Sequence, residues 1–217
     1  MWSSEVTNMI ITGIWETLYM TLVSTLVGYV IGLPMGIILT VSDKDGIKPN
    51  AVLYKILDVI ANIVRSVPFI ILLVLLIPFT RLVVGKSYGS TATIVPLVIA
   101  AAPYIARMVE SSLKEVDAGV IEAARSMGAS NFTIITKVML VEARTSLLVG
   151  ATITLGTILG YSAMSGAVGG GGLGAIAIRY GYTRWQTDIM IVTVILLIIL
   201  FQIFQTVGMK LADKFDH

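Results

Sequence analysis

The sequence contains no cysteine, a single histidine and few charged residues. Without cysteine, the chain can form no disulfide bond and offers no thiolate ligand to a metal. The histidine is His217, the last residue, and no grouping of histidine with carboxylates resembles a catalytic or metal site. We therefore predict no catalytic residue, no metal ligand and no cofactor. The net charge of +2 gives no reason to expect a nucleic-acid partner.

A phosphate-binding loop is also missing. The tripeptide Gly85-Lys86-Ser87 imitates the end of such a loop, but the position of its first glycine is occupied by Thr80, and no strand precedes it. We therefore expect no nucleotide site in this chain. If the protein moves a solute against a gradient, the energy must come from another subunit.

What the sequence does contain is long uncharged runs. Charged residues make up only 13% of the chain, whereas average soluble domains carry roughly 25%. Four uncharged stretches hold 26, 20, 34 and 21 residues, within 17–42, 87–106, 145–178 and 189–209. A membrane-spanning helix needs about 20 apolar residues, so each stretch is long enough to cross a bilayer. The pattern predicts an all-α integral membrane protein.

We expect five transmembrane helices in a single transmembrane domain over 1–217, with spans at about 14–40, 56–79, 91–109, 146–164 and 189–207. The second span contains Arg65 and is interrupted by prolines at 68 and 78. One hypothesis for Arg65 is a snorkelling side chain that pairs with Asp58 or a carbonyl. The other hypothesis is a gate or interface residue, and the sequence favours neither.

The distribution of lysine and arginine predicts the orientation. With five spans, only Arg81, Lys86, Arg179 and Arg184 lie on one side, and the other eleven of the fifteen basic residues lie on the opposite side. Because cytoplasmic loops carry the excess of positive charge, we predict the N-terminus outside and the C-terminus inside.

The longest polar interruption, residues 117–141, lies between the third and fourth spans, on the predicted cytoplasmic side. Asp117 can cap a short helix, Gly128 can end it in the left-handed conformation, and Ser130 can cap the next one. The helix carries Val120, Ile121, Ala124 and Met127 on one face. We predict a helix-turn-helix elbow whose small Ala123–Ala124 surface lets another protein approach closely.

This stretch resembles a known motif. Glu122-Ala123-Ala124, three residues, Gly128, nine residues, then 138–141 is similar to the E-A-A-x3-G-x9-I-x-L-P loop of ABC importer permeases. Val138 replaces the isoleucine and Val141 the proline. Further segments at 15–21, 65–73, 101–110 and 161–174 resemble permeases of methionine importers. The resemblance implies that Glu122, Ala123, Ala124, Met127 and Gly128 contact an ATPase subunit.

The same resemblance implies a bacterial cytoplasmic (inner) membrane location and a set of partners. These are a second copy of this permease, two cytoplasmic ATP-binding subunits, an external solute-binding lipoprotein and the lipid bilayer. The chain would not itself be an enzyme, because ATP hydrolysis would take place in the partner. The cargo implied is methionine.

Five helices are few to enclose a path, so we expect a homodimer. Candidate path or gate residues are Tyr161, Ser162, Met164 and Ser165, and Met164 is a flexible thioether that either plugs the path or fills a gap between helices. The glycine-rich run 165–174 is too rich in glycine for a regular helix and indicates a packing corner. Glycines 28, 32 and 36 indicate close helix packing, and we favour packing within one protomer over a dimer interface.

Three alternatives remain open at this point. The cargo could be another amino acid or a small metabolite, since no residue in the spans identifies methionine by its chemistry. The chain could be a stand-alone channel or carrier, which would conduct without an ATPase. A purely structural anchor is disfavoured by the elbow and by the interrupted second span.

Overall fold

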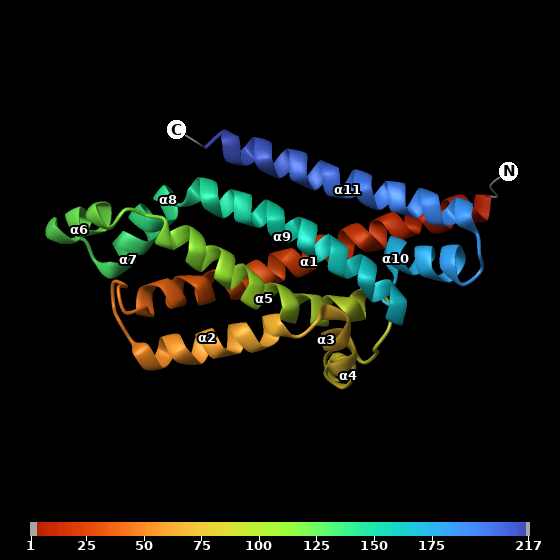
Figure 1. Ribbon diagram of the computed structural model, residues 1–217, viewed down its shortest axis with the longest axis horizontal. Coiled ribbons are helices and arrows are strands. Elements are labelled where there is room, and N and C mark those ends of the chain that lie inside the picture. Colours follow the sequence, from red (N-terminus) through yellow and green to blue (C-terminus); the bar gives the residue numbers. More distant parts are fainter. Residues whose placement is uncertain (1–3, 216–217) are drawn as a thin grey trace.

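The computed structural model describes residues 4–215, and His217 lies outside them. The described part of the chain is built from helices. Four are long: α1 (Ser4–Ser42), α5 (Ser90–Lys114), α9 (Arg144–Ser165) and α11 (Thr187–Asp213). The long helices run side by side as a bundle, with the first turn of α1 and the last turn of α11 at opposite ends (Figure 1).

Four helical segments of residues 4–215 are long and apolar enough to cross a membrane, and the number rises to five if α2 (Ala51–Ser66) and α3 (Phe69–Leu75) together count as one. An all-helical membrane protein is therefore confirmed. The helices exceed the expected spans at most ends. For example, α1 begins at Ser4 rather than near residue 14, because its first polar turns still form regular helix.

The region expected as the second span is not one helix. α2 and α3 meet at an angle of 102°, and α4 (Ile77–Val84) follows as a further short helix. The bend occurs where the ring of Pro68 excludes helical geometry from the preceding residue, and Val67 is accordingly extended with φ −83° and ψ 124°. Pro78 does not break a helix, since it lies in the first turn of α4, where its missing N–H is no loss.

α1 and α5 pack with their backbones in close approach. A Cβ at Gly32 would lie 2.6 Å from the carbonyl oxygen of Ala102, and one at Gly36 would lie 2.6 Å from that of Ala106. A Cβ at Gly28 would instead meet a side chain, 2.9 Å from the Cβ of Ala101. The prediction that these glycines serve packing inside one protomer is confirmed. Small residues matter here because lipid provides no hydrophobic driving force between helices, so close contact must hold them together.

We expect Gly32→Ala to lower the stability of the folded protomer by about 1–3 kcal/mol, because the new methyl group has no room beside a backbone carbonyl. The measurement is thermal unfolding of the purified protein in detergent. Val30→Ala, which trims an exposed side chain on the same helix, is the control. Equal stability of Gly32→Ala and the parent would show that α1 and α5 are not packed this closely.

The glycine-rich run forms the corner between α9 and the next helices. A left-handed Gly169 and Gly171 (φ 84° and 89°) turn the chain, but a helix resumes at once as α10 (Gly172–Ile176) and continues with the π-helical segment η3 (Ala177–Tyr182). The expectation of non-helical structure throughout 165–174 was therefore wrong, because the tight turn needs only three residues. The packing corner itself is confirmed, since a Cβ at Gly174 would lie 2.1 Å from the oxygen of Ala163.

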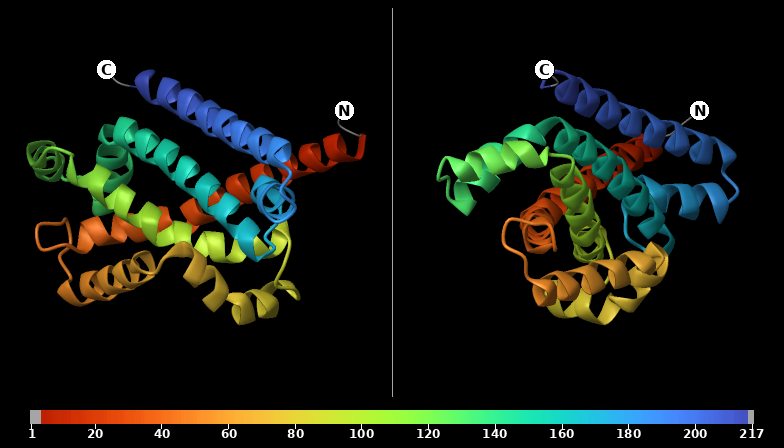
Figure 2. Two further views of the ribbon diagram at one scale, coloured as in Figure 1. Left: turned by 45° about the vertical axis from the view of Figure 1, so that its right-hand side comes forward. Right: turned by 60° about the vertical axis from the view of Figure 1, so that its left-hand side comes forward.

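The corner is anchored to two other helices. The N–H of Gly172 donates to the carboxylate of Glu16 on α1 over 2.7 Å, and the Thr93 hydroxyl on α5 donates to the carbonyl of Gly170 over 3.2 Å. These bonds satisfy backbone groups that the turn leaves without helical partners. They fix the corner at the end of the bundle opposite the elbow (Figure 2).

Candidate functional site

The elbow folds as its local sequence predicts. The short helix α6 (Ala118–Ser126) begins at Asp117, whose carboxylate accepts a 2.7 Å hydrogen bond from the N–H of Gly119. It ends in a Schellman motif, with Gly128 at φ 81° and the Ala129 N–H donating to the carbonyl of Ala124 over 3.1 Å. Ser130 caps the following helix α7 (Asn131–Thr133), as expected. The predicted capping residues are therefore confirmed.

Most of the predicted contact residues point outward from the elbow, but Ala124 does not. Glu122, Ala123 and Gly128 are exposed, and the side chain of Met127 is 82% exposed. Ala124 is 5% exposed and packs into the apolar cluster that also contains Ile134 and Met139. The expected Ala123–Ala124 surface is thus half wrong, because Ala124 attaches the elbow to its own protomer. Phe132, 76% exposed, was not selected from the sequence.

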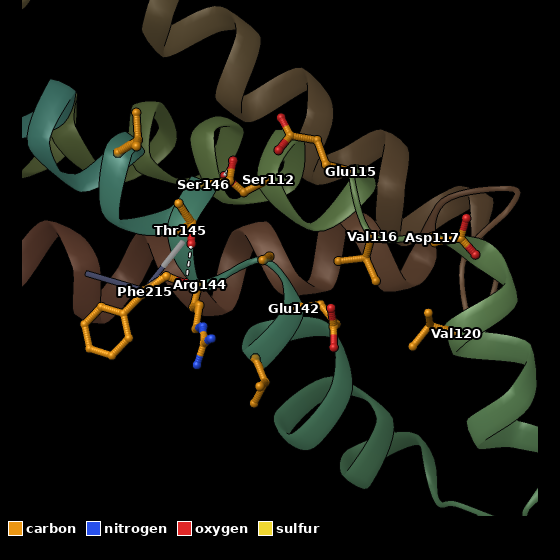
Figure 3. Close-up of a pocket in the computed structure, with 13 residues that line it drawn as sticks. Ser112, Glu115, Val116, Asp117, Val120, Glu142, Arg144, Thr145, Ser146 and Phe215 are labelled. Atoms are coloured by element: carbon orange, nitrogen blue, oxygen red, sulfur yellow. Dashed lines mark hydrogen bonds between the residues drawn. The ribbon is translucent and has the colours of Figure 1, made fainter. Parts of the chain in front are cut away.

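A cavity of about 780 Å³ separates the start of the elbow from the start of α9. Figure 3 shows its polar lining, with the carboxyl groups of Glu115, Asp117 and Glu142 around it and Arg144 at another edge. The hydroxyl of Thr145 donates to the carbonyl of Phe215 over 3.1 Å and so holds the end of α11 beside α9. The elbow is therefore attached along part of its surface only.

The other side of the elbow faces the loop between α1 and α2. A second cavity of about 500 Å³ lies there, and the guanidinium of Arg125 reaches across to donate to the carbonyl of Ile47 over 3.0 Å. Arg125 is thus a direct bond between the elbow and a segment 78 positions earlier in the chain. In the E-A-A-x3-G motif Arg125 is one of the three unspecified positions, so the motif assigns it no role.

The four candidate path residues divide into two kinds. Met164 is 45% exposed, and Tyr161 is partly buried, with its ring stacked on that of Phe69 at 4.5 Å between centroids. Ser162 and Ser165 are buried, and their hydroxyls donate to carbonyls of their own helix. Within the described protomer the helical stripe that exposes Met164 turns positions 162 and 165 inward, so Met164 is the most exposed of the four candidates, and the path role stays a prediction.

A charged cluster centred on the buried Glu110 lies between α2 and α5, and sequence reasoning missed it. Arg107 donates to Glu110 over 2.6 Å and to the carboxylate of Asp58, and Lys114 donates to Glu110 over 2.8 Å and to Asp43 over 2.7 Å. The spacing of polar residues could have revealed it. Arg107, Glu110 and Lys114 share one face of α5, and Tyr54, Asp58 and Asn62 share one face of α2.

Arg65 takes neither expected partner. Asp58 is occupied by Arg107, and within residues 4–215 Arg65 forms no salt bridge. Its guanidinium instead lies over the ring of Tyr104, 6.0 Å from the ring centre. The proposed Arg65–Asp58 pair is wrong because Arg107 reaches the same carboxylate from within the bundle. Arg65 is exposed, which leaves an interface role open as a prediction.

Outside the spans, Asp43 shows how the cluster reaches the loop after α1. The hydrogen bond from Lys114 is the main reason that the pKa of the Asp43 carboxyl is below its usual value. The folded state therefore gains stability from this carboxylate above its ordinary pKa and loses it as the pH falls through the lowered value. At neutral pH the bond is fully formed.

Apolar spanning helices, a broken helix and a capped polar elbow at one end of the bundle define a membrane transport subunit. The chain belongs to the family described as binding-protein-dependent transport system inner membrane component, which matches residues 28–214. The family description places it in the inner membrane as a transport component, and it is not an enzyme in its own right.

The chain is similar along its length to permease proteins of methionine transport systems. The probable D-methionine transport system permease protein MetI of Vibrio cholerae is 49% identical over 216 residues, covering 100% of this chain and 96% of that protein. The D-methionine transport system permease protein MetI of Escherichia coli K12 is 52% identical over 158 residues, 73% of each chain.

Among solved structures, a chain of the MetNI methionine ABC transporter in inward-facing conformations matches with a TM-score of 0.98 at 49% identity, covering 100% of both chains. An amino acid ABC transporter crystallised with histidines matches with a TM-score of 0.73 at 22% identity, over 98% of this chain and 94% of that one. The latter shows a shared fold alone.

Proposed function

We infer that this chain is the permease subunit of an ATP-driven methionine importer. The observation that carries this conclusion is similarity over the whole chain, in sequence and in shape, to methionine permeases and to the MetNI transporter. The elbow supports it, because a chain without a phosphate loop needs a surface that receives work from an ATPase. The partners are a second copy of this permease, two cytoplasmic ATP-binding subunits and an external solute-binding lipoprotein.

The chain crosses the membrane five times in this proposal, with α2 and α3 together forming the second span. The elbow, which bears Arg125 and Lys137, then lies in the cytoplasm, and the N-terminus lies outside. The opposed ends of α1 and α11 in the bundle support this arrangement, as does the excess of basic residues on the elbow side (Figure 1).

The ATPase contact is formed by the outward surface of the elbow. Ala123 and Met127 supply a small residue beside a flexible apolar one, and Glu122 supplies a charge at the rim. Gly128 permits the sharp turn that presents them. Ala124 contributes by holding α6 to the bundle rather than by touching the partner.

The translocation path follows a face of α9 that the protomer leaves uncovered. Ile153, Gly160 and Met164 repeat at helical spacing along this face and are exposed, with the Thr157 hydroxyl between them. A second copy of the chain would close this face into a path. Met164 lies near the glycine corner and the Phe69–Tyr161 stack, so its thioether is placed to block and release the path.

In this mechanism, ATP binding brings the two ATPase subunits together and draws the two elbows with them. The bundles then rotate, the path closes toward the cytoplasm and opens toward the binding protein. Hydrolysis releases the elbows and returns the inward-open state. The segment 179–188 at the outer end carries Tyr182 and Trp185, both highly exposed, and is our candidate contact for the binding protein.

The test is reconstitution. The permease, assembled with its ATPase and binding protein in lipid vesicles, should accumulate labelled methionine only when ATP is present on the ATPase side. Permease alone should give no passive methionine flux, whereas flux without the ATPase would identify a channel or carrier. ATP-dependent uptake of another amino acid but not methionine would keep the class and change the cargo.

A further inference from the structure

α2 contacts the bundle through a row of polar groups and only two clearly packed apolar side chains, Ala61, which is buried, and Val64, which lies against the core. Within Ala51–Ser66 only Ala61 is buried. Most of its large apolar side chains are exposed, including those of Val52, Ile56, Ile60 and Ile63. Because lipid is as apolar as these side chains, they provide no force that holds α2 against its neighbours. The attachment must come from the other face of the helix.

That other face carries Tyr54, Asp58 and Asn62, one above another at four-residue spacing. All three meet the charged cluster on α5. The Tyr54 hydroxyl donates to Glu110 over 3.3 Å, and Arg107 donates to the side chains of both Asp58 and Asn62, the latter over 3.0 Å. Arg107 also donates to the backbone carbonyl of Asp58 over 3.3 Å.

Arg107 is the centre of this arrangement. One terminal nitrogen of its guanidinium bonds Glu110 on its own helix while the other bonds α2, so the planar fork joins the two helices in one orientation. Glu110 is 5% exposed and also accepts from Lys114. A buried charge with its partner removed is costly, so the pair resists separation more strongly than an exposed ion pair does.

The cluster continues to the elbow. Lys114 bonds Asp43, which begins the loop joining α1 to α2, and Arg125 of the elbow bonds the Ile47 carbonyl in that same loop. At its other end, α2 leads through the bend at Pro68 into α3, whose Phe69 stacks on Tyr161. α2 therefore lies between the elbow and the proposed gate, joined to the first through the hydrogen-bonded loop before it and to the second through the stacked ring of Phe69.

We propose that Arg107 is a positioning residue that makes α2 move with α5 and the elbow, so that work received at the elbow reaches the α2–α3 bend beside the gate. This rests on the proposed function. The transport cycle needs a physical link between positions 58 and 107, and the charges supply it. A contact chain alone does not demonstrate coupling, so the test must restore the link without the charges.

Because the chain contains no cysteine, introduced cysteines are its only thiols and can be crosslinked selectively. In the double variant Asp58→Cys, Arg107→Cys, both charges are removed, and a bifunctional, thiol-cleavable crosslinker can then join α2 to α5. In vesicles with the ATPase and binding protein, methionine transported per ATP hydrolysed should fall about tenfold in the unlinked variant. Crosslinking should bring it back near the parent ratio, and reduction should lower it again.

Three single variants complete the design. Asp58→Asn keeps the shape of the side chain and should also lower the transport-to-hydrolysis ratio, while Lys44→Gln, which breaks an exposed ion pair with Asp45, should leave it unchanged. Arg107→Lys keeps the charge but loses the fork and should also lower the ratio. The parent complex treated with crosslinker reports any effect on partner subunits.

The outcomes separate the two proposals. If the parent complex does not couple ATP hydrolysis to methionine uptake, the proposed function fails. If the parent does so and the unlinked double variant or Asp58→Asn keeps the parent ratio, the positioning role is overturned. It is equally overturned if the crosslinked variant remains uncoupled, because charge rather than connection would then be what the cycle requires.

Discussion

Met127→Asp should abolish stimulation of ATP hydrolysis by the binding protein and should weaken assembly with the ATPase about 30-fold or more. Met127 is 82% exposed at the end of α6, so an aspartate there costs the free permease almost nothing. In the assembled transporter the same carboxylate would be removed from water against an apolar surface, and changes at the centre of an interface cost about 2 kcal/mol or more. Pull-down and coupled ATPase assays on the reconstituted complex measure both effects.

The matched control for this variant is Lys210→Asp, another exposed position on the elbow side, at the end of α11. It should leave assembly and ATPase activity near the parent values. Both variants should unfold within about 0.5 kcal/mol of the parent, as surface changes usually do. Normal assembly of Met127→Asp would mean that this surface of the elbow does not contact the ATPase. A variant at Ala124 would be a poor test, because that side chain is buried in its own protomer.

Gly174→Ala should prevent the corner between α9 and α10 from closing and should destabilise the protomer by about 3 kcal/mol or more. A Cβ at this position would lie 2.1 Å from the carbonyl oxygen and 2.6 Å from the Cα of Ala163, and backbone atoms cannot rotate away as a side chain can. Overpacking of this kind typically costs 1–3 kcal/mol even where side chains can adjust. The measurement is the yield and unfolding midpoint of protein solubilised in detergent.

Gly160→Ala provides the control, because nothing in the described protomer lies within 4 Å of a Cβ at that position of α9. It should fold as well as the parent, and alanine's higher helix propensity favours the substituted helix by roughly 1 kcal/mol. If Gly174→Ala were as stable as Gly160→Ala, the corner would have to be more open than described here. A loss of transport in a well-folded Gly160→Ala would support the assignment of this face of α9 to the path.

Local sequence was sufficient for features that depend on a few neighbouring residues. Asp117, Gly128 and Ser130 predicted the caps of the elbow, because capping depends on the side chain and backbone of one turn. The uncharged runs predicted the long helices in the same way. The glycine run was partly misjudged, since composition over ten residues does not show that one three-residue turn at 169–171 is enough and that helix resumes after it.

Features that depend on residues distant in the chain could not be predicted from the sequence. No pattern near Ala124 says whether it faces a partner or its own bundle, and no pattern near Ser162 or Ser165 says which side of α9 is covered. The sequence alone does not show whether Asp58 pairs with Arg65 or with Arg107. The packing of α2 on α5 brings Asp58 to Arg107.

The sequence by itself determined that this is a helical membrane protein with a capped elbow and with no phosphate loop of its own. Those properties follow from hydropathy, turn chemistry and residue types, which act over a few turns of chain. Only the tertiary structure decided which elbow residues remain available to another protein, which face of α9 is uncovered, and that a charged cluster joins α2 to α5. Each of these depends on which helices meet, and burial and ion pairing exist only once they do.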